Sequence, residues 1–85
     1  MDQNDILRQQ IFEIIRNQKK DNDPPETNAT FKRLKNMGYS DEDADKLIGQ
    51  CVAAEVFGIF KHGRPFNNKR YIKNLHNLPK EPSED

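Results

Sequence analysis

The 85-residue sequence has a single cysteine, a formal net charge of zero and no apolar run long enough to cross a bilayer. One cysteine excludes an internal disulfide and is typical of a reducing cytoplasm. Zero net charge favours neither nucleic acid nor membrane as a partner. The first residues, Met-Asp-Gln-Asn-Asp, lack the basic and apolar regions of a signal peptide. We therefore expect a cytoplasmic protein with no membrane association.

Apolar residues are also scarce. Hydrophobic residues make up 33% of the chain and charged residues another 33%, which allows only a thin core for one domain. Neither strand-like alternation nor an internal repeat is present, whereas helical spacing recurs. The predicted fold is all-α: a small four-helix domain over residues 1–79, followed by a disordered charged tail, residues 80–85. A partner protein or a homo-oligomer would help to stabilise such a chain.

The stretch from Ser40 to Gly63 predicts a long central helix, the third of the four. Ser40 is a favourable N-cap with three acidic residues after it, and Gly63 is a favourable left-handed residue beyond the last turn. One stripe at helical spacing is apolar. Its members are Ala44, Leu47, Ile48, Cys51, Val52 and Ile59.

The second half of this helix is apolar on its other side as well. Val56, Phe57 and Phe60 lie there. A helix that is apolar all round has to be covered all round, by its own chain or by another copy. We expect these three residues to form an interface, so that the protein is a small interaction module that self-associates.

Shorter helices are predicted over residues 5–18, 24–36 and 68–78. The first is an ordinary amphipathic helix. Asp23 is the expected N-cap of the second, with proline in its first turn. Asn67 is the expected N-cap of the last, and Phe66 is expected to pack on Tyr71 as a hydrophobic staple.

Glu55 is an isolated charge on the central helix. No Lys or Arg stands three or four positions away, so the usual surface ion pair is missing. A buried carboxylate needs a cation or several hydrogen-bond donors. The candidates for that role are Arg33, His62, Arg70 and Tyr71. A structural anchor between helices is the favoured interpretation, and a catalytic acid or metal ligand is the alternative.

The C-terminal third of the chain contains basic residues but no acidic ones before its last five positions. Residues 56–80 contain no Asp or Glu, and the basic residues proposed to contact an anion or nucleic acid are Lys61, Arg64, Lys69, Arg70 and Lys73. Phe66 and Tyr71 lie among them and could stack on bases. Nucleic-acid binding is therefore the alternative function. No recognised nucleic-acid-binding motif accompanies the charge.

The whole pattern resembles an uncharacterised family of small bacterial all-helical proteins. The resemblance is carried by Pro24-Pro25, Thr30, Arg33-Leu34, Gly38-Tyr39-Ser40, Glu55, Gly63, Phe66, Arg70-Tyr71, Leu75 and Leu78-Pro79. It covers nearly the whole chain before the tail and contains no catalytic signature. It implies that Arg33, Glu55 and Tyr71 belong to one structural polar constellation.

Motifs for catalysis or metal binding are lacking. His62 and His76 fall on different predicted helices, and convergence with Glu55 would be needed for a metal site. Cys51 has no adjacent basic residue that would lower its pKa. We expect no enzymatic activity, no catalytic residue, no cofactor and no metal.

Overall fold

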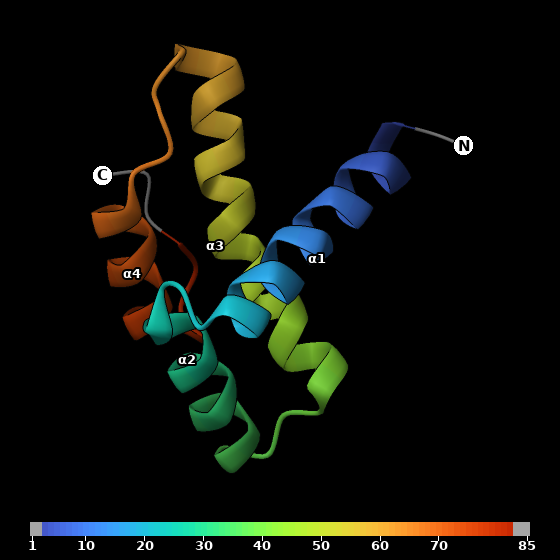
Figure 1. Cartoon of the computed structure of the whole chain (residues 1–85), viewed down its shortest axis with the longest axis vertical. Coiled ribbons are helices and arrows are strands. Elements are labelled where there is room, and N and C mark those ends of the chain that lie inside the picture. The colour runs from blue at the N-terminus through green and yellow to red at the C-terminus, as the bar shows by residue number, and fades with distance from the viewer. Residues whose placement is uncertain (1–2, 83–85) are drawn as a thin grey trace.

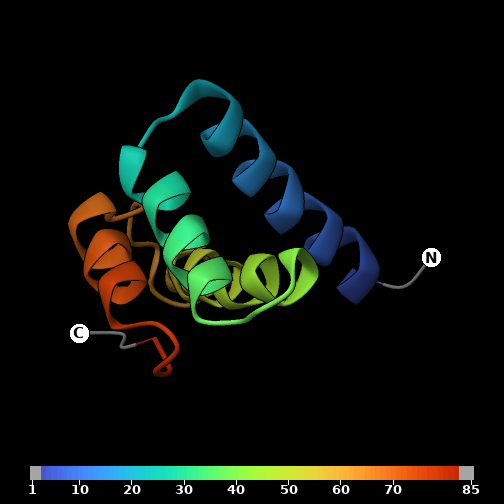
Figure 2. The ribbon, with the colours of Figure 1, turned by 90° about the horizontal axis from the view of Figure 1, so that it is seen from below.

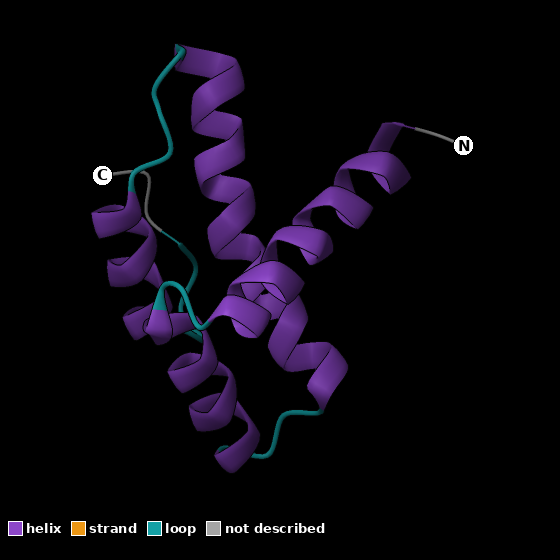
Figure 3. Ribbon diagram, viewed as in Figure 1, coloured by secondary structure: helices purple, strands orange, loops and turns teal. Residues whose placement is uncertain are grey.

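The computed structural model of the chain describes residues 3–82, and in that range it contains four helices and no strand (Figures 1 and 3). They are α1 Gln3–Asp21, α2 Pro25–Asn36, α3 Asp41–His62 and α4 Asn68–Asn77. The predicted all-α fold with a long third helix is thus confirmed.

Helix α3 is the axis of the fold. It contacts the other three helices, whereas α2 and α4 lie side by side on one flank and α1 crosses on another (Figures 1 and 2). The core fills the space where they meet, and its buried members are Ile15, Leu34, Ala44, Ile48, Cys51, Val52, Tyr71, Leu75 and Leu78. Because α3 supplies four of these nine side chains, it organises the core.

The ends of α3 follow the predicted capping. Ser40 Oγ accepts a hydrogen bond of 3.1 Å from the Asp43 N–H, and Gly63 takes the left-handed conformation at φ 63°. Ile59 differs from the prediction, because 41% of it is exposed although it falls on the apolar stripe. At this end of α3, α2 is distant and α1 has diverged, so the helix is covered on fewer sides (Figure 1).

Helices α1 and α2 depart from prediction at their junction. Helix α1 continues to Asp21 instead of ending at residue 18. Lys19 stabilises this extra turn, because its Nζ lies 2.5 Å from Asp45 Oδ1 and 3.7 Å from the centre of the Phe31 ring. The N-cap of α2 is Pro24, without a side-chain cap bond, so the predicted capping by Asp23 is wrong.

The first residues of the predicted tail, 80–82, contact the helical domain. The Lys80 N–H donates to the Asn77 carbonyl, and Glu81 and Pro82 lie beside Ala54 and Phe57 of α3. The remaining residues of that tail, 83–85, lie outside the described part of the chain.

Candidate functional site

Glu55 is held by the start of α4. Its carboxylate has no exposed surface, and the Arg70 guanidinium donates to it from Nε to Oε2 at 2.6 Å and from Nη2 to Oε1 at 2.8 Å. The Asn67 N–H adds a third bond, to Oε1 at 2.9 Å. Asn67 also caps α4, since its Oδ1 accepts from the Arg70 N–H. We call Glu55, Asn67 and Arg70 the Glu55 clamp.

The clamp keeps Glu55 ionised. Burial raises the pKa of the Glu55 carboxyl, but hydrogen bonds from Arg70 and the Asn67 N–H, with the charges of Arg70 and Arg64, outweigh burial and leave the pKa below its ordinary value of 4.5. A carboxylate that accepts two hydrogen bonds from one guanidinium forms a strong, geometrically defined ion pair. The clamp therefore joins α3 to α4 as a structural anchor.

This pKa shift predicts acid sensitivity. Because the folded-state pKa lies below the unfolded-state value, the clamp contributes its full stability above about pH 4.5 and loses it as the pH falls through the folded-state pKa. Urea unfolding midpoints between pH 7 and pH 3 should show this loss. In Glu55→Gln the group does not titrate, so the stability gap between the two proteins should narrow with acid. A gap that stays constant down to pH 3 would contradict the prediction.

Arg64 lies against α3 beside the clamp. A methyl group added at Gly58 would lie 3.0 Å from Arg64 Nη2 and 3.4 Å from Nε, so glycine gives the guanidinium room to pack on the helix. Its Nε is buried and has no hydrogen-bond partner in the described part of the chain. Arg64 thus adds a second positive charge near Glu55.

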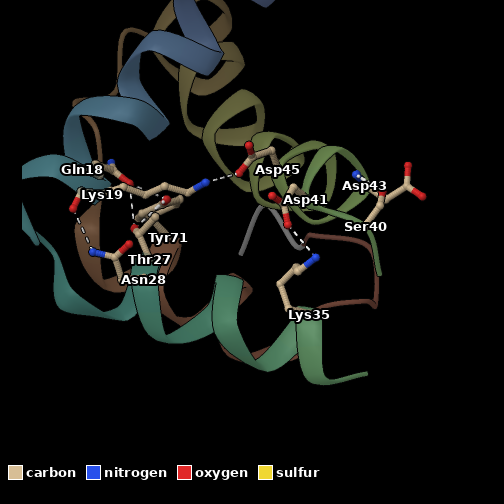
Figure 4. A network of polar contacts seen from close by, with 10 residues as sticks. All are labelled: Gln18, Lys19, Thr27, Asn28, Lys35, Ser40, Asp41, Asp43, Asp45 and Tyr71. Carbon is tan, nitrogen blue, oxygen red and sulfur yellow. Dashed lines mark hydrogen bonds and ion pairs between the residues drawn. The ribbon is translucent and has the colours of Figure 1, made fainter. Parts of the chain in front are cut away.

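Tyr71 belongs to a separate polar group between α1, α2 and α4. Its hydroxyl lies 2.7 Å from Gln18 Oε1 and 3.2 Å from Thr27 Oγ1, and Thr27 Oγ1 in turn lies 2.7 Å from Gln18 Oε1 (Figure 4). The amide oxygen accepts from both hydroxyls. Burial raises the pKa of Tyr71 to about 12, so the phenol stays protonated.

Arg33 serves the other end of α4. Its Nη1 donates to the Leu78 carbonyl and its Nη2 to the Leu75 carbonyl, each at 2.9 Å. The predicted single constellation of Arg33, Glu55 and Tyr71 therefore divides into three sets of partners. Each set contacts a different part of α4: the Glu55 clamp its first turn, Tyr71 its middle and Arg33 its last carbonyls.

The five predicted basic contacts divide in a similar way. Arg64 and Arg70 are partly buried beside Glu55, whereas Lys61, Lys69 and Lys73 are exposed. Lys69 and Lys73, with Asn67 and Arg70, line a hollow of about 420 Å³ on α4. The lysines are thus the cations of this set that are directed to solvent.

The predicted apolar interface on α3 is largely exposed to solvent. Phe60 is 76% exposed and Phe57 49% exposed, while Val56 is partly buried against the core. Large apolar side chains at such exposure on neighbouring helical turns are typical of an interaction surface. We call Val56, Phe57 and Phe60 the α3 patch.

A groove adjoins the α3 patch. It has a volume of about 250 Å³ and lies between α1 and α3, lined by Leu7, Arg8, Ile11, Phe12, Lys46, Gly49, Gln50 and Ala53. The two helices approach closely at Gly49, where a methyl group would meet Ile11 Cγ2 at 3.4 Å. From there the N-terminal half of α1 and the C-terminal half of α3 spread apart (Figure 1). Sequence reasoning missed this groove, because it treated each helix alone.

Cys51 and the two histidines were the side chains considered for reactive chemistry, and they lie in different surroundings. Cys51 is fully buried, and burial raises the pKa of its thiol to about 12. His62 and His76 are exposed on α3 and α4. Within residues 3–82, no group of three or more His, Cys, Asp or Glu side chains is placed to hold a metal ion. Nor does any helix there combine the length and apolar character needed to span a membrane.

A scan against protein-family models finds no match for the chain, and searches of curated proteins and of solved structures also find none. The resemblance to the bacterial helical family therefore depends on the sequence pattern alone.

Proposed function

We propose that this protein is a small, non-enzymatic interaction module of the cytoplasm that self-associates through the α3 patch. The observation that carries the proposal is the exposure of Phe57 and Phe60 on a helix whose opposite side forms the core. Fully burying one such side chain contributes about 1.5–3 kcal/mol. In a symmetric dimer each residue would be buried twice, since both copies use the same surface.

Sedimentation equilibrium of Phe57→Glu with Phe60→Glu tests this proposal. The wild-type chain is expected to form a dimer at micromolar concentration, and the variant a monomer with unchanged helicity, because buried carboxylates would lack partners. Met37→Glu is the matched control, since Met37 is 53% exposed at the end of α2, and it should remain dimeric. A wild-type chain that is monomeric up to about 1 mM, where association would be worth only about 4 kcal/mol, would contradict the proposal.

The exposed lysines of α4 support nucleic-acid binding as the second candidate function. Fluorescence anisotropy with a labelled RNA or DNA 20-mer tests it, and binding should weaken steeply as salt is raised. Lys69→Glu with Lys73→Glu should abolish it without disturbing the Glu55 clamp. Lys20→Glu with Lys32→Glu makes the same change of charge elsewhere and should retain it. No binding even at low salt would contradict this candidate.

A further inference from the structure

A hollow between the loop after α3 and the first turn of α4 adjoins the Glu55 clamp. It has a volume of about 400 Å³ and is lined by Arg64, Pro65, Phe66, Asn67, Asn68 and Arg70. Two of these six side chains carry a guanidinium group and none is acidic. A concave surface with cations and no acid in its wall attracts an anionic ligand.

The charges around this hollow do not cancel. Arg70 is paired with Glu55, which also accepts from the Asn67 N–H and has no exposed surface. Arg64 lies near the same carboxylate, but none of the ion pairs within residues 3–82 includes it. Glu81, the one other acid described after Glu55, lines a different hollow. One positive charge is therefore left over beside the clamp, and it is that of Arg64.

Arg64 is held in place against α3. Its Nη2 and Nε lie 3.0 and 3.4 Å from the position of a methyl group at Gly58, so the glycine lets the guanidinium contact the helix. The buried Nε has no acceptor within residues 3–82. A cation that is ordered without a partner carboxylate is preorganised for an anion, because little of its freedom remains to be lost on binding.

The start of α4 adds donors that suit a phosphate. Asn68 lines the hollow, and the backbone N–H groups of Asn68 and Lys69, the first two residues of α4, have no acceptor inside the helix. Lys69 also lines the adjoining hollow of about 420 Å³, which shares Asn67 and Arg70 with this one. A phosphate has enough oxygens to accept from a guanidinium and from several N–H groups together.

We propose that the hollow at the start of α4 binds a phosphate group, with the Arg64 guanidinium as its principal contact. Two kinds of molecule carry this group: a small phosphate monoester and the phosphodiester backbone of a nucleic acid. The proposal does not depend on self-association through the α3 patch. It also involves a residue other than the lysines assigned to the second candidate function.

Titration of the full ¹⁵N-labelled chain with inorganic phosphate at constant ionic strength tests this proposal. Saturable shifts of the Arg64, Asn68 and Lys69 amide signals are expected, with a dissociation constant of about 1–10 mM for a few charge-assisted hydrogen bonds. Arg64→Gln should raise that constant at least about tenfold. Lys20→Gln removes an exposed cation from α1 and should change it by less than about twofold. Circular dichroism melts verify that each variant folds.

Gly58→Ala separates binding from folding. Alanine favours a helix more than glycine does, so the melting temperature should not fall. The new methyl group displaces the Arg64 guanidinium, so the dissociation constant for phosphate should rise at least about threefold. Unchanged phosphate binding in Gly58→Ala overturns the proposal. So do wild-type shifts that stay linear up to about 50 mM phosphate, and an equal effect of Arg64→Gln and Lys20→Gln.

Methyl phosphate and dimethyl phosphate, titrated in the same way, distinguish the two sources of the phosphate. Binding of methyl phosphate without dimethyl phosphate supports a site for a small monoester. Binding of both with similar dissociation constants supports a site for a nucleic-acid backbone, whose charged groups are phosphodiesters. Absence of binding by inorganic phosphate and by both esters overturns the proposal and leaves the proposed self-association intact.

Discussion

Replacing Arg70 with methionine is expected to lower the free energy of unfolding by about 3–5 kcal/mol, because it leaves the Glu55 carboxylate buried without its cation. The Asn67 N–H would remain as the donor from the clamp and Arg64 as a nearby charge, but neither replaces the bidentate hydrogen bonds of the Arg70 guanidinium. Native domains are stable by about 5–15 kcal/mol, so the loss is a large fraction of the total. Urea denaturation followed by circular dichroism measures it.

Two control variants make this result specific to the ion pair. Lys73→Met removes an exposed cation from the same helix and should change stability by no more than about 0.5 kcal/mol. Glu55→Met combined with Arg70→Met removes both charges and should recover most of the loss, because an apolar pair can replace a buried ion pair at little cost. Equal stability of Arg70→Met and Lys73→Met would refute the role assigned to the clamp.

Replacing Arg33 with methionine is expected to lower the free energy of unfolding by about 2–3 kcal/mol, through loss of two charge-assisted bonds. Both acceptors are carbonyls of buried residues, Leu75 and Leu78, at the end of α4. The Leu75 carbonyl also accepts from the Leu78 N–H, so the Leu78 carbonyl is the one that loses its described donor. The stability of Arg33→Lys should lie between those of the wild-type protein and Arg33→Met, since one ammonium group cannot reproduce the two-pronged geometry of the guanidinium.

Thermal and urea unfolding of these variants, compared with Lys32→Met on the exposed side of the same helix, measure the effect. Lys32→Met should be close to wild type. The prediction fails if Arg33→Met and Arg33→Lys match that control.

The local signals of the sequence were sufficient for the number of helices and for both ends of α3, but not for the end of α1 or the N-cap of α2. Capping by Ser40 and Asn67, the left-handed Gly63 and the contact of Phe66 with Tyr71, at 5.4 Å between ring centres, are confirmed because each depends on residues close in the chain. The burial of Glu55 also agrees with the prediction, since the lack of nearby cations is visible in the sequence.

Partners distant in the chain could not be assigned in the same way. Arg33 reaches carbonyls more than forty positions away, and Tyr71 meets Gln18, a polar residue at the predicted end of the first helix. Helical spacing says which side of a helix is apolar but not how two helices cross. The groove lies beside the close approach of α1 to α3 at Gly49, so it was not predictable from either helix alone.

Arginine side chains fasten both ends of α4. Arg70 ties its first turn to α3, and Arg33 holds its last carbonyls from α2. An isolated helix of ten residues would be mostly unfolded in water, so α4 depends on its contacts with the other helices. Because both of its ends are held by arginine side chains, α4 cannot unwind gradually from either end. We therefore expect α4 to detach in one cooperative event, so that its backbone amides exchange hydrogen for deuterium at a single common rate.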